Sequence, residues 1–198
     1  MSGLRERKKL RTQEALSWAA LRLTVERGLE HVLVEDIAAE AGVSPRTFNN
    51  YFSSKAEAIA WRHLNRARQA ADLIRERPGA EPLWESITQA VLQHAGGEHR
   101  QPDPQWTAGV RIMLAEPALF GEYLKANAKA AEEVTVAIAE RTGTNATDMY
   151  PRLVAAAVMA ANQAAIEQWV NADPPVPLLP LLTEAVNQFA AGLPDPSA

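Results

Sequence analysis

Residues 34–55 read VEDIAAEAGVSPRTFNNYFSSK, and this stretch decides the fold. It holds two short helical patterns, the first from about Glu35 to Ala41 and the second opening at Ser44-Pro45. Serine is a favoured N-cap and proline a favoured first helical residue, and Gly42 can take the positive φ that a tight turn needs. Two short helices joined by a glycine-containing turn predict a helix-turn-helix.

The second helix of this motif has an inward and an outward face. Phe48 points inward and holds the helix against the first one, while the outward face carries residue types that contact bases and phosphates. Lys55 begins the next helix, where a cation and free amides can hold a phosphate. The candidate DNA-binding residues are Arg46, Thr47, Asn49, Asn50, Tyr51 and Lys55. The alternative is an ordinary helical hairpin with a solvated face.

A basic arm precedes the motif. Arg5, Lys8 and Lys9, with two further arginines between residues 5 and 11, could follow a DNA backbone or enter a minor groove. Residues 1–77 carry 14 Lys+Arg and 10 Asp+Glu, a net charge of +4, whereas residues 78–198 carry 6 and 14, a net charge of −8. The net charge of −4 for the whole chain therefore hides a basic N-terminal part that suits an anionic partner.

Composition excludes several classes of protein. The 198 residues contain no cysteine, which excludes disulfides, thiolate nucleophiles, iron–sulfur clusters and zinc sites with a cysteine ligand. The longest apolar run covers nine residues, 153–161, and a membrane span needs roughly 20. The start of the chain lacks the apolar stretch of a secretory signal, so we expect a cytoplasmic protein without membrane contact. Because no metal-ligand or catalytic motif is found, we expect no metal, no cofactor and no enzyme activity.

The sequence outside residues 34–55 also predicts helices. Capping, proline and glycine signals predict an all-α fold of about nine helices. Starts are expected at the Ser54-x-x-Glu57 capping box, Pro82, Asp103-Pro104, Pro117 and Asn145, and stops at Gly28, Gly42, Pro78-Gly79, Gly96-Gly97, Gly143 and Gly192. We divide the chain into a three-helix DNA-binding domain (1–53), a helical ligand-binding and dimerisation domain (54–192) and a flexible tail (193–198).

Residues 10–62 resemble the DNA-binding domain of the TetR family of bacterial transcription repressors. The resemblance lies in the order and spacing of Ala19-Ala20-Leu21, Gly28, Val34-Glu35-Asp36-Ile37-Ala38, Ala41-Gly42-Val43-Ser44, Thr47, Phe48, Tyr51-Phe52 and Lys55. Two positions depart from the family pattern. Leu33 stands where the family often has a threonine or serine that caps the helix and contacts a phosphate, and Asn49 stands where it often has a tyrosine that touches a phosphate.

The resemblance implies that the C-terminal helices form a ligand pocket and a dimer interface. An alanine-rich segment and the last helix suit a close, self-complementary bundle across a two-fold axis. The candidate interface residues are Ala157, Ala161, Ala164, Leu182, Val186 and Phe189. The alternative is that both helices pack only within one chain.

Candidate pocket residues are the polar residues that interrupt apolar helices, together with large apolar side chains near them. They are Arg111, Trp84, Trp106, Met113, Phe120, Tyr123, Met159, Asn162, Gln163 and Ile166. The stretch from Arg111 to Phe120, the alanine-rich helix and Trp169 resemble the acyl-coenzyme-A-responsive branch of the family. That resemblance implies a long apolar effector, with Arg111 as partner of its anionic group. Aromatic and methionine residues at helical spacing are, however, more often plain core than pocket lining.

The leading hypothesis is a homodimeric repressor that binds a palindromic double-stranded DNA operator and is released by a small, largely apolar effector, an acyl-CoA or fatty acid. The effector would favour the state whose two recognition helices do not match successive major grooves, about 34–36 Å apart. Such a regulator works in the bacterial cytoplasm, at the nucleoid when bound to DNA. The alternatives are a dimeric DNA-binding protein without an effector and, more distantly, a small all-helical enzyme.

Overall fold

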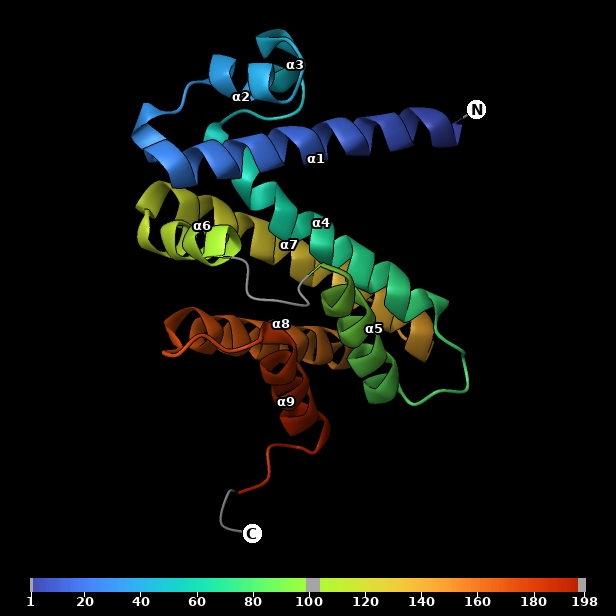
Figure 1. Ribbon diagram of the computed structural model, residues 1–198. Coiled ribbons are helices and arrows are strands. Elements are labelled where there is room, and N and C mark those ends of the chain that lie inside the picture. The colour runs from blue at the N-terminus through green and yellow to red at the C-terminus, as the bar shows by residue number, and fades with distance from the viewer. Residues whose placement is uncertain (1, 99–103, 196–198) are drawn as a thin grey trace. The chain divides into compact units, whose positions relative to one another are not determined.

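The computed structural model describes residues 2–98 and 104–195, and every regular element in these ranges is a helix (Figure 1). This confirms the predicted all-α class, and the nine α-helices of the described ranges match the predicted number. The elements are α1 (Ser2–Arg27), the 3₁₀ helix η1 (Leu29–His31), α2 (Val34–Glu40), α3 (Pro45–Asn49), α4 (Lys55–Glu76), α5 (Leu83–Glu98), α6 (Pro104–Ala115), α7 (Pro117–Thr142), α8 (Met149–Asn171) and α9 (Leu178–Ala190). No helix in the described ranges is long and apolar enough to cross a membrane.

The turn of the helix-turn-helix forms as the sequence predicts. Gly42 lies between α2 and α3 with a φ of 67°, a backbone conformation that residues with a Cβ rarely adopt. Ser44 caps α3, because its Oγ accepts a hydrogen bond from the backbone N–H of Thr47 at 3.2 Å, and Pro45 is the first helical residue. The local signals alone therefore define the start of α3.

One predicted helix start is wrong. α8 begins at Met149 and not at Asn145, because residues 145–148 form a turn in which Asp148 Oδ2 accepts a hydrogen bond from the backbone N–H of Asn145 at 2.9 Å. Pro151 falls in the first turn of α8, where its missing N–H leaves no hydrogen bond broken. Pro151 is therefore part of the start of this helix.

Two further signals are only partly correct. Ser54 Oγ accepts a hydrogen bond from the Glu57 N–H at 3.0 Å, as expected of a capping box. The Glu57 carboxylate, however, accepts from Ser53 N at 2.7 Å, one residue before the predicted partner. α5 continues through Gly96-Gly97 to Glu98, so these glycines lie in its last turn and do not end it.

Packing divides the chain into two compact units. The first contains the residues up to Leu64 together with Pro104–Ala126. Leu119 of α7 is buried in the same core as Phe48 of α3, and α6 approaches α1 so closely that a Cβ on Gly109 would lie 2.8 Å from Leu21 Cδ1. The helix-turn-helix is therefore supported by α6 and the start of α7, which the sequence assigned to the other domain.

The second unit contains Asn65–Asp103 and Asn127–Ala198, and its described part has a separate core. α8 packs against α9, and α5 also packs against α9. The buried side chains of this core include Ala71, Ile74, Ile87, Val134, Ala137, Ile138, Val154, Ala155, Ala161 and Val186. α4 and α7 are the two long helices whose sequences continue from one unit into the other.

Candidate nucleic-acid interface

The start of α2 shows how the chain manages without a threonine or serine at its N-cap. Leu33 occupies the N-cap with its side chain exposed, and a leucine side chain cannot accept a hydrogen bond. Asp36 Oδ2 instead accepts from the backbone N–H of Leu33 at 3.2 Å, and Arg27 Nη1 lies 3.6 Å from the same oxygen. Of the two hydrogen bonds of a capping box, only the one from the N-cap backbone to the side chain three residues later is therefore present. The Asp36 carboxylate also lies in the first turn of α2, where the helix dipole stabilises a negative charge.

α3 is held in place by Phe48, which is fully buried. The Phe48 ring lies 5.8 Å from the Phe52 ring, and Phe52 meets the Trp61 ring of α4 edge-on at 6.2 Å. Ile37 of α2 and Leu16 of α1 are buried in the same core. Because one side of α3 is fixed by this aromatic cluster, its opposite side faces outward.

The predicted DNA-binding residues of α3 do not all lie on that outward side. Arg46, Asn49 and Asn50 are exposed. Thr47 is half-buried, and its Oγ1 lies 2.9 Å from Ser44 Oγ, so this hydroxyl already takes part in the cap of α3. Tyr51 is half-buried and packs against the core of the first unit. The exposed guanidinium and amides are the groups of α3 best placed to reach base edges.

Lys55 has a position that the sequence did not predict. Its Nζ donates hydrogen bonds to the backbone carbonyls of Leu29, at 2.8 Å, and Val32, at 2.6 Å. The ammonium therefore ties the start of α4 to the segment that leads into α2. We assign this group to holding the motif together and leave it out of the proposed phosphate contacts.

We expect Lys55→Met to lower the free energy of unfolding by about 2–3 kcal/mol, because two charge-assisted hydrogen bonds are lost and two carbonyls are left without them. A urea titration followed by tryptophan fluorescence measures this change. A phosphate-contacting lysine would give another result: the slope of log affinity against log salt would fall by about 0.9 with unchanged stability. That second pattern would contradict the assignment.

The basic arm is helical. α1 begins at Ser2, so Arg5, Lys8 and Lys9 lie exposed on a helix, and Arg7 Nε donates to the Gly3 carbonyl at 3.1 Å. An α-helix with its side chains is about 10–12 Å wide, whereas the minor groove of B-DNA is about 6 Å wide. Of the two predicted modes, only contact with the phosphate backbone fits this conformation.

Arg62 is a buried supporting residue of the first unit that the sequence did not predict. It lies on α4 with 8% of its surface exposed, and its guanidinium carbon sits 3.4 Å from the centroid of the Trp18 ring of α1. A cation over an indole face is a favourable contact, and it joins the two helices that support the motif. The signal in the sequence is an arginine directly after the apolar residues 58–61 of α4.

The predicted pocket residues belong to both compact units. In the first unit, Arg111 is exposed on α6 and Met113 packs against the core. Tyr123 is buried on α7, with its ring 4.8 Å from the His63 ring of α4, and the exposed Phe120 stacks on Tyr123 at 6.2 Å. This unit therefore brings Phe120 and Tyr123 together.

The second unit holds the other predicted pocket residues. Trp84 of α5 packs partly buried against the core, and Met159, Asn162 and Ile166 are half-buried on α8. Gln163 is exposed, and its amide donates to Glu167 Oε1 at 2.9 Å. The side chain of Trp106 lies outside the described residues.

Three of the predicted dimer residues are covered by their own chain. Ala161, Leu182 and Val186 are 1%, 6% and 2% exposed within one protomer. Ala157 and Phe189 are half-buried, and Ala164 is exposed. Ala161, Leu182 and Val186 therefore pack within their own chain, and the dimer interface stays a prediction.

Comparisons with known proteins agree with this architecture. Residues 18–59 match the model of the bacterial regulatory proteins of the tetR family, and residues 81–194 match the model of the MftR C-terminal domain. The chain is 31% identical to the HTH-type transcriptional regulator TcmR of Streptomyces glaucescens, over 84% of this chain and 76% of that one. It is 28% identical to the putative mycofactocin biosynthesis transcriptional regulator MftR of Mycobacterium tuberculosis, over 94% and 93%.

Solved structures show the same fold. The structure of SmeT, the repressor of a Stenotrophomonas maltophilia multidrug efflux pump, has a TM-score of 0.61 at 16% identity, covering 93% of this chain and 96% of that one. Thermus thermophilus FadR, in complex with lauroyl-CoA, has a TM-score of 0.57 at 18% identity, covering 94% and 97%. The matched families and relatives are regulators rather than enzymes. The chain belongs to the TetR family of transcriptional regulators.

Proposed function

We propose that this regulator is a homodimeric repressor that reads a palindromic operator with α3 and is released by a small, largely apolar effector. DNA reading falls to residues 1–53, and effector binding and dimerisation fall to residues 54–192. The predicted tail, residues 193–198, lies partly outside the described residues. The observation that carries the proposal is that α3 has one buried apolar side and one exposed polar side. Phe48 is fully buried, while Arg46 and Asn49 of the same short helix and its C-cap residue Asn50 are exposed.

The roles on DNA follow from chemistry. Arg46 suits a guanine, and Asn49 and Asn50 suit adenines, because these side chains match the hydrogen-bonding edges of those bases in the major groove. Arg5, Lys8 and Lys9 contact phosphates and fix the register of the protein on the duplex. The operator lies on chromosomal DNA in the cytoplasm.

Dimerisation uses the outer face of α8. Leu153, Ala156, Ala160 and Ala164 are exposed at spacings of three and four residues, so they share one side of the helix. An open groove of about 850 Å³, lined in part by Ala164 and by Leu181 of α9, adjoins the end of this face. Small side chains let a second copy approach closely, and two-fold symmetry places two α3 helices on successive half-sites. Ala164 is the predicted interface residue that this face retains.

The effector class is supported by apolar candidates in each unit, Phe120 and Tyr123 in the first and Trp84, Met159 and Ile166 in the second. Arg111 of the first unit is a candidate partner for an anionic group. Thermus thermophilus FadR has been solved with lauroyl-CoA, and SmeT with triclosan, two ligands with large apolar parts. Lauroyl-CoA is therefore the first probe. A rise in the thermal unfolding midpoint supports an effector site, since a ligand of the native state stabilises it by mass action. Unchanged unfolding with acyl-CoAs and fatty acids alike favours the effector-independent alternative.

The experiment that tests the reading role is Arg46→Ala. If Arg46 contacts a guanine, affinity for the operator falls by about 1–3 kcal/mol, and the preference for the base pair at that position relaxes. Fluorescence anisotropy with operator fragments substituted one base pair at a time measures both effects. Lys129→Ala, an exposed cation of α7, is the matched control and leaves them unchanged. An equal loss on operator and unrelated DNA would instead make Arg46 a phosphate contact.

A further inference from the structure

α4 and α7 run parallel, side by side, within the second unit. Arg68 Nε donates to Glu133 Oε1 at 2.8 Å, and Arg75 Nε donates to Glu140 Oε2 at 2.6 Å. Each ion pair joins residues 65 apart in the sequence, and from the first pair to the second both helices advance by seven residues. A seven-residue advance on both partners is the spacing of a parallel two-helix seam with a fixed register.

The seam between the two ion pairs is apolar and buried. Ala71 and Ile74 of α4 belong to the same core as Val134, Ala137 and Ile138 of α7, and each is at most 3% exposed. Val134, Ala137 and Arg141 follow one another at spacings of three and four, so Arg141 takes the next position of the seam. At the level of Arg141 along α7, helix α4 has already ended, so α4 offers no apolar side chain for this position to pack against.

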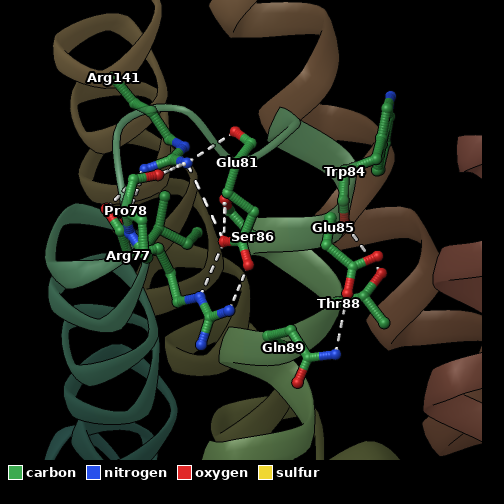
Figure 2. Close-up of polar contacts among 10 residues, drawn as sticks. Arg77, Pro78, Glu81, Trp84, Glu85, Ser86, Thr88, Gln89 and Arg141 are labelled. Carbon is green, nitrogen blue, oxygen red and sulfur yellow. Dashed lines mark hydrogen bonds and ion pairs between the residues drawn. The ribbon is translucent and has the colours of Figure 1, made fainter.

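Arg141 binds the end of α4. Its guanidinium donates hydrogen bonds to the backbone carbonyls of Arg77 at 3.0 Å, Pro78 at 2.7 Å and Glu81 at 2.9 Å, and only 6% of its side chain is exposed (Figure 2). The last carbonyls of a helix and of the turn after it lack helical partners and carry the negative end of the helix dipole. Arg141 satisfies these groups from a neighbouring helix.

Glu81 extends the cluster to the start of α5. Its carboxylate accepts hydrogen bonds from Arg77 and, at 2.6 Å, from Ser86 Oγ, and it lies 4.0 Å from the Arg141 guanidinium (Figure 2). The hydrogen bonds from Arg77 and Ser86 lower the pKa of Glu81 to about 2. The carboxylate beside Arg141 is therefore charged at neutral pH.

We propose that α4 and α7 form a single two-helix lever whose register does not change when the protein binds its operator, and that Arg141 is the positioning residue of its C-terminal end. Sliding one helix by a single residue moves it by about 1.5 Å and turns its contact face by about 100°, which breaks both ion pairs and the carbonyl contacts together. At the other end of α4, Lys55 holds the segment before α2. The proposal rests on operator binding as proposed above.

Cross-linking tests the register, and the absence of cysteine from the chain makes it direct. The double variant Arg68→Cys with Glu133→Cys is joined by a short bis-maleimide in the full-length protein. We expect efficient intramolecular cross-linking and an operator affinity within about twofold of the uncross-linked variant, the range for changes that do not interact. The control is the double variant Arg68→Cys with Glu140→Cys. Residue 140 lies one heptad, about 10 Å along α7, beyond residue 133, so we expect this pair not to be cross-linked.

Two outcomes overturn the fixed register. One is efficient cross-linking of the out-of-register pair, and the other is a loss of operator binding of about tenfold or more on in-register cross-linking. If the uncross-linked variants and the unmodified protein bind no operator at all, it is the proposed function that fails, while the cross-linking pattern still reports on the register.

Arg141→Met tests the positioning role. Operator affinity is expected to fall by about 5–150-fold, the usual range of coupling between sites, at a temperature where circular dichroism shows the variant fully folded. Arg141→Lys, which keeps the charge but lacks the planar fork, is expected to recover only part of the affinity. Lys129→Met, on the exposed side of α7, is the control. A lowered unfolding midpoint with unchanged operator affinity would show that Arg141 only stabilises the second unit.

Discussion

Replacing Phe48 with alanine is expected to lower the free energy of unfolding by about 3–5 kcal/mol, the cost of removing a buried phenylalanine and leaving a cavity. Phe48 is fully buried, and its contact with Phe52 continues to Trp61. Because the aromatic cluster fixes α3 against α4, operator binding is expected to be lost with the packing.

The change in stability is measured by urea denaturation, with tryptophan fluorescence and far-ultraviolet circular dichroism as two probes. Ala39→Ser, at an exposed position of α2, is the control and is expected to stay within about 0.5 kcal/mol of the unmodified protein. An unfolding midpoint for Phe48→Ala equal to that of the control would contradict the packing described for α3.

Removing three of the cations of α1, Arg5, Lys8 and Lys9, is expected to weaken DNA binding independently of sequence. In the variant with Arg5, Lys8 and Lys9 all replaced by alanine, the slope of log affinity against log salt falls by about 0.9 for each lost phosphate contact, which is about 2.7 for each protomer and about 5.4 for the bound dimer. Operator and unrelated DNA lose affinity by the same factor, because phosphate contacts carry no sequence information. Anisotropy titrations at several salt concentrations measure the slope.

The same titrations, repeated with a drug that binds the minor groove, test whether the basic segment stays helical on DNA. If α1 stays helical and contacts only the DNA phosphate backbone, a drug that occupies the minor groove does not change the affinity for DNA. Competition by a minor-groove drug, or a loss confined to A·T-rich flanks, would show that the segment unfolds and enters the groove. An unchanged salt slope would remove Arg5, Lys8 and Lys9 from the interface altogether.

The helix-turn-helix could be predicted because its signals are local. Gly42 supplies the positive φ, Ser44 supplies the cap, and Phe48 supplies the inward anchor, all within seven residues. Each choice depends on neighbours along the chain and not on distant contacts. The charge split also depends on composition alone, and it directed attention to the N-terminal part.

The remaining features depend on contacts between distant residues. Lys55 bonds carbonyls 26 and 23 residues away, and Arg141 bonds carbonyls 60–64 residues away, so neither partner is visible in a sequence window. Likewise the sequence predicted Ala161 and Val186 as dimer-interface residues. An apolar face in the sequence does not show whether a helix of the same chain or of a second copy packs against it. Only the packing of α8 on α9 shows that their own chain covers them.

The central claim is that exposed residues of α3 read a particular DNA sequence. The direct measurement compares, at one salt concentration, the affinity of the full-length protein for the DNA upstream of its own gene with its affinity for an unrelated fragment of equal length. The account predicts a preference of about 10³-fold or more for a fragment that holds an inverted repeat, and a much smaller preference for Arg46→Ala. Equal affinity for both fragments, with a steep salt dependence for each, would contradict it.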